Sequence, residues 1–322
     1  MQAVILAAGK STRTYPLTLT RPKPLLKVVG KTLLEYNLDN LNGLVSEVIL
    51  VVGYKKNMIK KYFGEKYKGI RIKYIEQKQQ LGTGHALLMA ENHIKNRFLL
   101  MMGDDIYARS DLKNCSKHRY SILASRVKDP GNFGVISEKN SFMVDFIEKP
   151  KKPKSNLANN ALYSLDKKIF IYLRKTKKSK RREIELPDAL KMLSEKNRVK
   201  VIKTKKWKPI VYPWDLFRIK KQSIGRNCTI KGMVKNSIIM DNTVIGKGSV
   251  VENSIIGENV YFDGKIIAGD NAYSLVKGKK INAGKLGAII GDNVRARNVI
   301  IAPGCKIWPN KKIKGEIRND VT

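Results

Sequence analysis

The sequence predicts an α/β domain with a parallel sheet, followed by a smaller β-helix domain. In the first part of the chain, strand-like segments alternate with amphipathic helical ones, an order typical of a parallel sheet covered by helices. From Ile224 onward this alternation stops, and apolar steps recur about every six residues, often beside a glycine. A period of six with β-branched residues is typical of a β-helix, in which each turn stacks on the next.

Four short segments of the α/β domain are predicted strands: 3–6, 47–52, 70–76 and 98–102. Leu34, Leu38 and Leu41 share one face of a helix between the first two strands, and a second helix is predicted at 84–92. Ligands of parallel α/β sheets bind at the carboxyl ends of the strands. We therefore expect the loop after the first strand and the pair Asp104-Asp105 at one edge of the sheet.

Beyond about Asp129 the pattern changes to strands joined by loops, with further strands predicted at 133–136, 144–147 and 159–165. The repeats have apolar positions at Ile238, Val244, Val250 and Ile256, and again at Ile301, Ile307 and Ile313. A set of short β-hairpins is the alternative interpretation. The segment 263–287 interrupts the period and is predicted to form a protruding loop. These patterns divide the chain into domains at residues 1–218 and 219–322.

The chain is strongly basic, with 64 Lys and Arg against 27 Asp and Glu and a formal net charge of +37. The positive electric field of such a charge steers anionic substrates toward the protein. It also favours the binding of nucleic acid through its phosphates. A lysine-rich proteome or a polyanion-rich cytosol is the third explanation. The chain has neither an arginine cluster interleaved with aromatics nor zinc-finger spacing, so we expect no specific nucleic-acid recognition.

The spacing of the cysteines and the length of the apolar runs indicate in which cellular compartment the protein resides. Cys115, Cys228 and Cys305 lie far apart, which excludes a disulfide framework and a pair of metal ligands. The first predicted strand begins almost at Met1, without a signal-peptide pattern, and no apolar run approaches the roughly 20 residues of a membrane span. We expect a soluble cytoplasmic protein without a membrane partner.

The first strand leads into the run Leu6-Ala7-Ala8-Gly9-Lys10-Ser11-Thr12-Arg13, and Pro22-Lys23-Pro24-Leu25 follows. Backbone N–H groups of such a small-residue loop can face an anion, and an Arg and a Lys add positive charge, as a nucleoside triphosphate requires. A P-loop is excluded because its first glycine position holds Val4, and no G-x-G-x-x-G is present.

This run resembles the signature loop of sugar-1-phosphate nucleotidylyltransferases, in which a sugar phosphate attacks the α-phosphate of a nucleoside triphosphate and pyrophosphate leaves. The resemblance implies a Rossmann-like nucleotidylyltransferase domain. It also implies nucleotide-binding roles for Leu6, Ala8, Gly9 and Ser11, and catalytic roles for Arg13 and Lys23. Ser11 stands where the family usually has glycine. Across the chain, the motifs are most similar to archaeal bifunctional N-acetylglucosamine-1-phosphate uridylyltransferase/acetyltransferase proteins, with a reduced C-terminal half.

Asp104 follows a strand and Gly103, with Asp105 next to it. A carboxylate at a strand end can hold Mg²⁺, which neutralises charge on a reacting phosphate. The alternative is a solvated turn after a strand. The run Met102-Gly103-Asp104-Asp105 resembles the Gly-Asp metal site of the family, which implies Asp104 as the ligand of Mg²⁺.

The run from Ile75 to Ala86 resembles the base-recognition loop of N-acetylglucosamine-1-phosphate uridylyltransferases. The amide of Gln77 can both donate to and accept from a pyrimidine edge, and Gly82 allows a base to approach the backbone. The resemblance adds Thr83 to this nucleotide site and favours uracil, although thymine presents the same edge. His85 is expected to pack at the start of a helix and not to be catalytic.

Three further motifs resemble the sugar side of the family site, in the same order along the chain. Phe133-Gly134-Val135 resembles its aromatic-glycine turn, and Glu148-Lys149-Pro150 its Glu-Lys-Pro. Asn159-Asn160-Ala161-Leu162-Tyr163 resembles its Asn-Ala-Gly-Ile-Tyr. The resemblance implies that Gly134 and Asn159 contact the sugar, that Glu148 accepts from its hydroxyls, and that Lys149 pairs with its phosphate.

Two departures from the family pattern concern activity. Pro209 stands where the family has its second metal-binding Asp, so either Asp104 holds Mg²⁺ with water and substrate phosphates, or Asp105 assists, or activity is reduced. The repeats resemble the acetyltransferase half of the archaeal enzymes, usually a left-handed and often trimeric parallel β-helix. Lys247 replaces the expected general-base His there, and no His follows His118. We expect acetyl transfer to be lost, and the repeats to assemble a homo-oligomer, either a trimer or a dimer.

The sequence therefore predicts an enzyme that joins UTP or dTTP to a hexose-1-phosphate, such as N-acetylglucosamine-1-phosphate or glucose-1-phosphate. Three alternatives stay open: a noncatalytic regulatory subunit of the same fold, a bifunctional enzyme with a working acetyltransferase, and a nucleic-acid-binding protein. The sequence does not select the sugar, the pyrimidine base or the oligomeric state.

Overall fold

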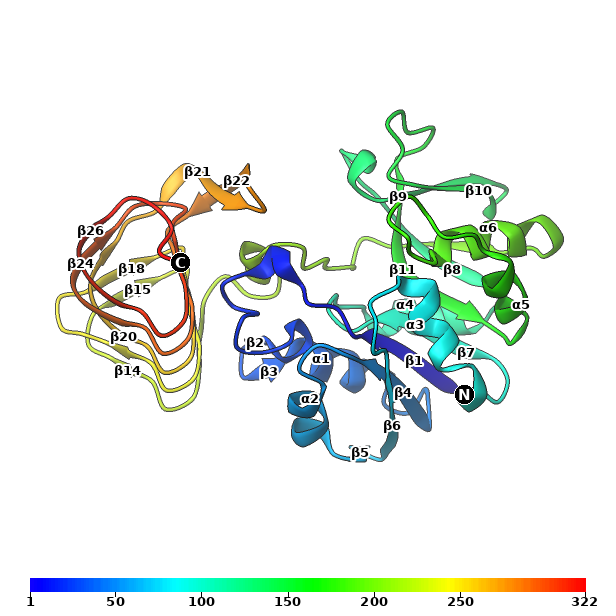
Figure 1. Ribbon diagram of the computed structural model, residues 1–322, viewed down its shortest axis with the longest axis horizontal. Coiled ribbons are helices and arrows are strands. Elements are labelled where there is room, and N and C mark those ends of the chain that lie inside the picture. Colours follow the sequence, from blue (N-terminus) through cyan, green and yellow to red (C-terminus); the bar gives the residue numbers. More distant parts are fainter. The chain divides into compact units, whose positions relative to one another are not determined.

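The computed structural model describes all 322 residues of the chain, which fold as two compact units (Figure 1). The first unit consists of Met1–Gly9 and Leu34–Pro209. The second consists of Lys10–Leu33 and Ile210–Thr322. The segment Lys10–Leu33, which the sequence patterns assign to the α/β domain, thus folds together with the C-terminal repeats.

A ten-stranded sheet forms the centre of the first unit, in the order β5-β6-β4-β1-β7-β11-β8-β12-β10-β9. Its strands are β1 (Gln2–Ala7), β4 (Glu47–Val52), β5 (Lys66–Tyr67), β6 (Ile70–Glu76), β7 (Phe98–Met102), β8 (Ser121–Arg126), β9 (Gly134–Lys139), β10 (Phe142–Glu148), β11 (Leu157–Leu165) and β12 (Lys200–Lys203). β6, β4, β1 and β7 run parallel, and β11 pairs antiparallel with β7.

The register of the parallel strands places their carboxyl ends at one edge of the sheet. Leu6 of β1 lies opposite both Val51 of β4 and Met102 of β7, and Val52 lies opposite Glu76 of β6. The predicted parallel arrangement is confirmed. The segments that follow Ala7, Val52, Glu76 and Met102 therefore start from the same edge.

Six α-helices belong to this part of the chain: α1 (Leu33–Leu41), α2 (Lys56–Phe63), α3 (Thr83–Met89), α4 (Arg109–Ser116), α5 (Lys168–Lys175) and α6 (Leu186–Lys196). Leu87, Phe170 and Leu190 of α3, α5 and α6 are buried in one core with Phe98 and Leu100 of β7. The helix predicted at 84–92 is observed as α3 followed by a single 3-10 turn, Glu91–His93. None of the helices is long and apolar enough to cross a membrane.

The second unit contains short parallel strands stacked at regular intervals (Figure 1). One sheet consists of β13 (Ser223–Ile224), β16 (Ile238–Ile239), β19 (Ile255–Ile256), β23 (Ile289–Ile290) and β25 (Lys306–Ile307). The other consists of β14 (Thr229–Ile230), β15 (Met233–Lys235), β17 (Val244–Ile245), β18 (Val250–Glu252), β20 (Tyr261–Ile266), β24 (Arg295–Ile301) and β26 (Lys312–Ile317). Because these strands pair in parallel, the alternative of successive short hairpins is wrong, and the stacking fits a β-helix.

Identical residue types stack in successive turns of the repeats. Ile239, Ile256, Ile290 and Ile307 lie opposite one another in register and are buried in a common core. A second ladder consists of asparagines with positive φ angles: Asn227, Asn242, Asn259, Asn293 and Asn310. Neighbouring asparagine amides donate to one another at 2.9–3.2 Å. Asparagine suits this position because it tolerates the left-handed conformation.

The predicted loop at 263–287 requires a correction. Residues up to Ile266 continue β20, and the remainder forms an antiparallel hairpin of β21 (Gly269–Val276) and β22 (Lys279–Leu286). Its turn residues Lys277 and Gly278 have φ angles of 50° and 75°, as a two-residue hairpin turn requires. The search for a period of six could not detect the alternating burial of a hairpin, which has a period of two.

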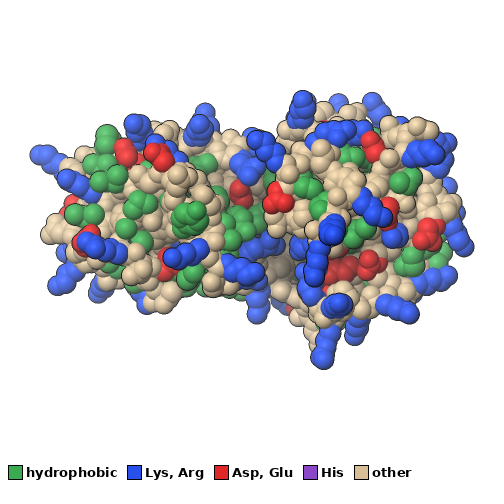
Figure 2. All heavy atoms as spheres, turned by 90° about the horizontal axis from the view of Figure 1, so that it is seen from above, with side chains coloured by type: hydrophobic (Ala, Val, Ile, Leu, Met, Phe, Trp, Pro, Cys, Tyr) green, Lys and Arg blue, Asp and Glu red, His purple; other side chains and the backbone are tan.

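Basic side chains are spread over the face of the molecule shown in Figure 2, and acidic ones are fewer. On this face the basic residues do not gather into a single stripe. A broad positive field of this kind attracts anionic small molecules.

We expect the isoleucine ladder to carry much of the stability of the repeats. Ile256→Ala removes a fully buried side chain and should lower the free energy of unfolding by about 2–5 kcal/mol. Ile300, which is 53% exposed, provides the control, because Ile300→Ala should change it by less than about 0.5 kcal/mol. Urea unfolding followed by circular dichroism measures both. Equal losses in the two variants would contradict the buried ladder.

Candidate nucleotide and sugar-phosphate site

The loop after β1 begins at the carboxyl edge of the parallel sheet. The carbonyl of Leu6 accepts from the N–H of Gly103 at 2.9 Å, at the end of β7. The carbonyl of Ala8 accepts from the N–H of Tyr54 at 3.0 Å and from Nε2 of Gln80 at 3.1 Å. Both Leu6 and Ala8 are buried, so the backbone that leads to Gly9 is held in place from both sides.

No contact or backbone angle within the protein requires a glycine at position 9. A Cβ built on it would have no heavy atom within 4 Å, and its φ is not in the left-handed region. The N–H groups from Gly9 to Arg13 also donate to no protein acceptor. Successive N–H groups left in this state form an anion-binding concavity. The start of the loop is therefore suited to phosphate.

Ser11 fixes the shape of the loop in the second unit. Its φ of 51° is left-handed, which accounts for the glycine usual at this position in the resembled family. Its carbonyl accepts from the hydroxyls of Thr14 at 2.7 Å and Thr18 at 2.9 Å. Arg13 is exposed, whereas Lys23 is buried in the 3-10 turn Lys23–Leu25.

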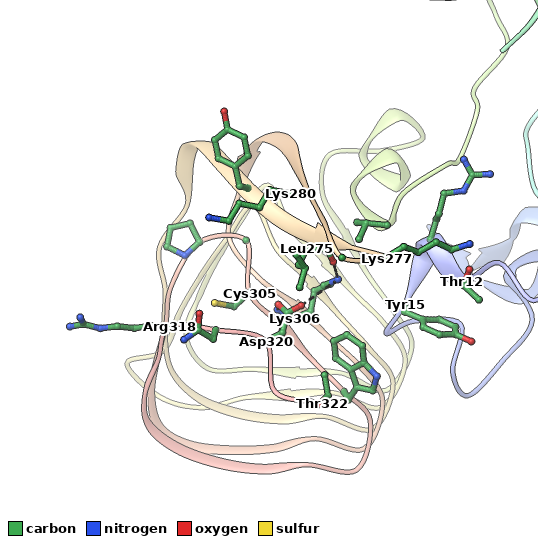
Figure 3. Close-up of a pocket in the computed structure, with 18 residues that line it drawn as sticks. Thr12, Tyr15, Leu275, Lys277, Lys280, Cys305, Lys306, Arg318, Asp320 and Thr322 are labelled. Atoms are coloured by element: carbon green, nitrogen blue, oxygen red, sulfur yellow. Dashed lines mark hydrogen bonds and ion pairs between the residues drawn. The ribbon is translucent and has the colours of Figure 1, made fainter. Parts of the chain in front are cut away.

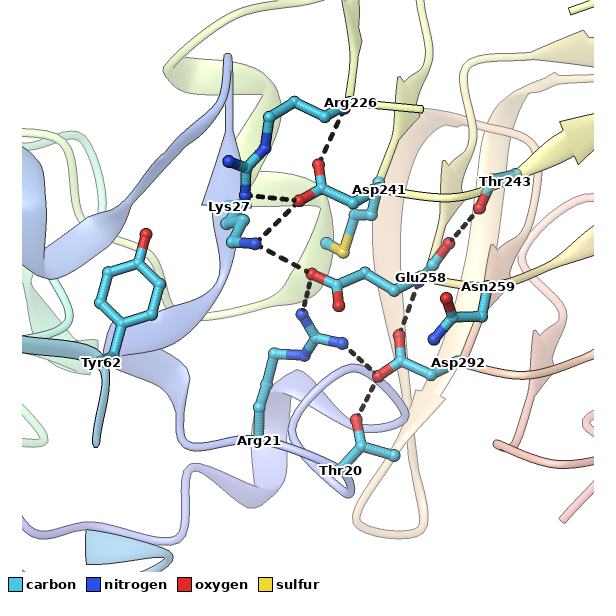
Figure 4. Close-up of polar contacts among 12 residues, drawn as sticks. Thr20, Arg21, Lys27, Tyr62, Arg226, Asp241, Thr243, Glu258, Asn259 and Asp292 are labelled. Atoms are coloured by element: carbon cyan, nitrogen blue, oxygen red, sulfur yellow. Dashed lines mark hydrogen bonds and ion pairs between the residues drawn. The ribbon is translucent and has the colours of Figure 1, made fainter. Parts of the chain in front are cut away.

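An ion-pair cluster holds the segment around Lys23 on the repeats (Figure 4). The guanidinium of Arg21 binds both Glu258 and Asp292. The ammonium of Lys27 lies 2.8 Å from Asp241 and 3.5 Å from Glu258. Because Arg21 and Lys27 flank Lys23, the cluster determines where Lys23 lies in the second unit.

The three carboxylates of this cluster occupy equivalent places in successive turns. Asp241, Glu258 and Asp292 each lie two residues after a stacked isoleucine, namely Ile239, Ile256 and Ile290. Three stacked acids repel one another unless cations face them. The cations of Arg21 and Lys27 supply that compensation, and Arg226 adds a contact at 3.3 Å to Asp241.

Burial makes this cluster energetically important. Burial alone lowers the pKa of Arg21, but Asp292 and Glu258 outweigh it and raise that pKa above its usual value. Burial likewise raises the pKa of Asp241, and its hydrogen bonds with Lys27 and Arg226 outweigh this and lower the pKa. Removing one partner would leave buried charges unpaired, which costs about 3–5 kcal/mol.

Asp104 and Asp105 follow β7 at the carboxyl edge of the sheet. The Oδ2 of Asp105 accepts from Nε1 of Trp207 at 3.1 Å. Ile106 and Lys208 exchange two backbone hydrogen bonds of 3.1 Å, which places Pro209 in the strand-like segment beside this acidic pair. The position that the sequence compares with the second metal ligand thus faces Asp105 across this antiparallel bridge, and its proline side chain carries no donor atom.

The donor set around Asp104 determines what kind of cation it fits. No group of three or more His, Cys, Asp or Glu residues in the chain could hold a metal ion. Mg²⁺ is commonly held by one or two carboxylates together with substrate phosphates and water. Asp104 therefore fits a cation that arrives with a phosphate substrate, and it does not fit a metal held by the protein alone.

The structure modifies the predicted role of Gln77. Its Nε2 donates to the carbonyl of Gly82 at 3.1 Å and lies 3.0 Å from Nδ1 of His85. Burial lowers the pKa of His85, which favours the neutral ring, whose Nδ1 can accept from this amide in one tautomer. Both amide hydrogens are thus engaged, so only Oε1 of Gln77 can contact a base. His85 packs near the start of α3, as predicted.

Gly82 and Thr83 are constrained by the protein itself. Gly82 has a φ of 98°, and a Cβ there would lie 2.5 Å from the carbonyl oxygen of Ile184. Thr83 begins α3, and its Oγ1 accepts from the N–H of Leu186 at 3.4 Å. The glycine is therefore required by the close approach of Ile184, a contact that the sequence interpretation, which assigned that space to a base, did not foresee.

The predicted sugar-side residues meet where β9 and β10 pair. Gly134 lies opposite Glu148, and a Cβ at 134 would lie 2.9 Å from Oε2 of Glu148. Lys149 has a φ of 45°, its N–H donates to Phe133 at 3.0 Å, and its Nζ lies 3.5 Å from Oε1 of Glu148. Glu148 and Lys149 therefore form a close acid–base pair beside a glycine.

Asn159 of β11 belongs to the same region. Ala158 lies opposite Val135 of β9, so Asn159 is one residue beyond that pair. Its Nδ2 donates to the hydroxyl of Tyr163 at 2.7 Å. Burial raises the pKa of Tyr163, and the negative charge of Glu148 raises it further.

The sequence model of the nucleotidyl transferase family matches residues 2–223 of this chain. The chain belongs to the nucleotidyl transferase family. This confirms the family that the signature loop predicted. The model of the GMPPB C-terminal domain matches residues 219–322.

Full-length relatives of this nucleotidyl transferase occur in archaea. It is 34% identical to the bifunctional protein GlmU of Methanocaldococcus jannaschii, over 96% of this chain and 92% of the relative. It is 32% identical to the bifunctional sugar-1-phosphate nucleotidylyltransferase/acetyltransferase of Sulfurisphaera tokodaii, over 97% and 96% of the two chains. A solved UDP-glucose pyrophosphorylase complexed with UDP-glucose matches with 26% identity and a TM-score of 0.62, over 67% of this chain and 95% of that one.

Gly9 provides a direct test of the nucleotidyl transferase loop. Gly9→Ala should leave the free energy of unfolding unchanged within about 0.5 kcal/mol, because the Cβ meets no protein atom. It should raise the KM for the nucleoside triphosphate at least about tenfold, because the methyl group occupies the phosphate approach. Gly53→Ala is the control, since its Cβ would lie 2.8 Å from the Ala8 carbonyl and should impair folding. An unchanged KM in Gly9→Ala would contradict the site.

The ion-pair cluster predicts an acid-dependent loss of stability. The lowered pKa of Asp241 gives a contribution that is fully present above the unfolded-state value of about 4 and is lost as pH falls through the folded-state value. The stability difference between wild type and Asp241→Asn should be about 3–5 kcal/mol at pH 7 and should shrink below about pH 4. The midpoints of urea unfolding of the two proteins, compared at several pH values, measure this difference. Asp270→Asn, at an exposed position, is the control for removing a surface carboxylate, and a constant difference for Asp241→Asn would refute the prediction.

Proposed function

We propose that the protein transfers a nucleotidyl group from UTP or dTTP to a hexose-1-phosphate, such as N-acetylglucosamine-1-phosphate or glucose-1-phosphate. The observation that carries the proposal is the loop from Gly9 to Arg13, whose N–H groups are not engaged by the protein. The relative from Sulfurisphaera tokodaii is named as a sugar-1-phosphate nucleotidylyltransferase/acetyltransferase, and one matched structure is named as a UDP-glucose pyrophosphorylase. These names support the substrate class.

The proposed reaction is a direct displacement at phosphorus. An oxygen of the sugar phosphate attacks the α-phosphorus, the bond from that phosphorus to the bridging oxygen breaks, and pyrophosphate leaves with that electron pair. The backbone from Gly9 to Ser11 binds phosphate oxygens, and the cations of Arg13 and Lys23 stabilise the charge of the triphosphate and the leaving pyrophosphate. No covalent intermediate with the protein is needed, because positioning and charge neutralisation lower the barrier.

The remaining predicted residues select and orient the two substrates. The Oε1 of Gln77 accepts from N3–H of uracil or thymine, whose edges are equivalent for this contact. Glu148 accepts from sugar hydroxyls, Lys149 pairs with the sugar phosphate, and Asn159 contacts the sugar. The proximity of Glu148 to both Gly134 and Lys149 supports this assignment.

Asp104 would hold Mg²⁺ together with the phosphates of the substrates. Bound Mg²⁺ would neutralise charge on the α-phosphate and the attacking oxygen. Pro209 gives no second ligand, so a noncatalytic regulatory subunit is the second candidate function. The engaged side chain of Asp105, which accepts from Trp207, makes Asp105 a weak substitute for that ligand.

Acetyl transfer is not part of the proposed function. Lys247, at the place of the expected general base, is exposed, and an exposed ammonium has no lone pair with which to accept a proton. The repeats instead stabilise the segment around Lys23 through the ion-pair cluster. We further propose that they form a left-handed β-helix, that they support a trimer or a dimer, and that domain boundaries of 1–218 and 219–322 describe the sequence modules.

Pyrophosphate release with Mg²⁺ tests the proposed function. UTP, dTTP, GTP and ATP are each combined with glucose-1-phosphate and N-acetylglucosamine-1-phosphate. We expect turnover with a pyrimidine triphosphate, and a fall in kcat of about 100-fold or more in Arg13→Ala, because a charge-stabilising donor is lost. Lys10→Ala, at an exposed neighbouring position, is the control.

The variant Pro209→Asp distinguishes the two candidate functions. Absence of turnover in wild type with gain of turnover in Pro209→Asp would support the regulatory subunit. Turnover in wild type that does not rise in Pro209→Asp would support an enzyme that needs no second carboxylate. Absence of turnover in both proteins would refute the proposed enzyme.

A further inference from the structure

A pocket of about 670 Å³ lies within the second unit (Figure 3). Three segments line it: residues 12–15 of the signature loop, the hairpin β21–β22, and the last turn of the repeats with the residues that follow it. Its volume is in the range typical of small-molecule sites. None of the residues predicted to bind the base or the sugar lines it.

The hairpin is fixed against the last turn of the repeats. A Cβ at Gly304, which has a φ of 83°, would lie 2.1 Å from the carbonyl oxygen of Tyr273. The buried ammonium of Lys306 donates to the carbonyl of Leu275 and lies 3.4 Å from Asp320. The N–H of Lys306 also donates to Asp320 at 2.8 Å. These contacts hold the two walls together, so the pocket is formed before any ligand binds.

Positive charge predominates in the lining. Its basic residues are Arg13, Lys277, Lys280, Lys306 and Arg318, and Asp320 is its acidic residue. The carboxylate of Asp320 is compensated by Lys306, and Arg318 pairs with Glu316 at 2.9 Å and points away from the pocket in Figure 3. Arg13, Lys277 and Lys280 have no carboxylate partner. Three uncompensated cations at one pocket favour an anionic ligand.

The inner surface of the pocket is apolar and aromatic. Trp308, Leu275 and Cys305 contribute to it, and the ammonium of Lys306 lies 5.4 Å from the Trp308 ring. Burial raises the pKa of the Cys305 thiol to about 11, so the sulfur is uncharged near neutral pH. An indole face next to cations is suited to a planar ring that carries phosphate.

We propose that this pocket is a second ligand site, which binds a nucleoside phosphate with its base against Trp308 and its phosphates near Arg13 and Lys277. Thr12, Arg13 and Tyr15 belong to the signature loop, so a ligand here contacts the loop that the proposed reaction uses. Arg13 cannot serve both ligands at once, so occupancy would inhibit the enzyme. The inhibition rests on the proposed function, whereas the binding does not.

Tryptophan fluorescence tests the binding without any turnover. The whole chain is titrated with UDP, and the response of wild type is compared with that of Trp308→Phe, a conservative change. We expect saturable quenching in wild type that is largely absent in Trp308→Phe. Equal quenching in the two proteins would overturn the proposal, because the signal would then come from Trp207 or Trp214.

Two neighbouring lysines give a matched test of the charge. Lys277, in the turn of the hairpin, lines the pocket, whereas Lys279, two residues further along, does not. Both are exposed, so Lys277→Glu and Lys279→Glu change the net charge equally. We expect the Kd for UDP to rise about tenfold or more in Lys277→Glu, and less than about twofold in Lys279→Glu. Equal effects of the two substitutions would overturn the site.

Two further ligands identify the recognised chemistry. Pyrophosphate binding as tightly as UDP would overturn the assignment of the base to Trp308, and uridine binding as tightly as UDP would overturn the role of the cations. Pyrophosphate release is assayed separately on the same proteins. Quenching without turnover would refute the proposed function and leave the proposal of this site intact. Turnover without quenching would support the proposed function and refute this site.

Discussion

The ion pairs of Arg21 and Lys27 with Asp241, Glu258 and Asp292 hold the segment around Lys23 on the repeats. Their partners are separated by 214, 237 and 271 residues along the chain. Because these charges are buried, each depends on its partners, and the cluster forms only when the turns of the repeats have stacked. The position of a predicted catalytic lysine in the second unit thus depends on the C-terminal third of the protein.

This constraint changes the interpretation of the repeats. Their stacked isoleucines and asparagines set the rise between turns, and the same regularity aligns three acids at one corner. Repeats that served only to assemble subunits would need no more than the ladder of stacked isoleucines. The acidic corner, compensated by cations from the N-terminal segment, indicates that the repeats also hold the segment around Lys23. The loop that precedes this segment contributes Arg13 to the pocket beside the hairpin, which relates that pocket to the proposed reaction.

Several features of the site were predictable from local patterns, and others were not. The strand ends, the small-residue loop and the order of the sugar-side motifs lie within short segments, and the structure places Gly134 opposite Glu148. The close approach of Ile184 to Gly82 and the bond from Trp207 to Asp105 join residues about a hundred positions apart, and no local pattern reports them. The acid–asparagine pairs Asp241-Asn242, Glu258-Asn259 and Asp292-Asn293 were the signal that could have indicated the acidic corner.

The sequence by itself determined the family, the strands of the parallel sheet and the period of the repeats, because each depends on residue types at short, fixed spacings. Only the tertiary structure decided that the segment Lys10–Leu33 folds with the repeats, that the amide hydrogens of Gln77 are already engaged, and that residues 269–286 form a hairpin over a cationic pocket. The physical reason is that charge compensation, hydrogen-bond partners and close backbone approach depend on distances between residues far apart in the chain, which composition and periodicity do not contain.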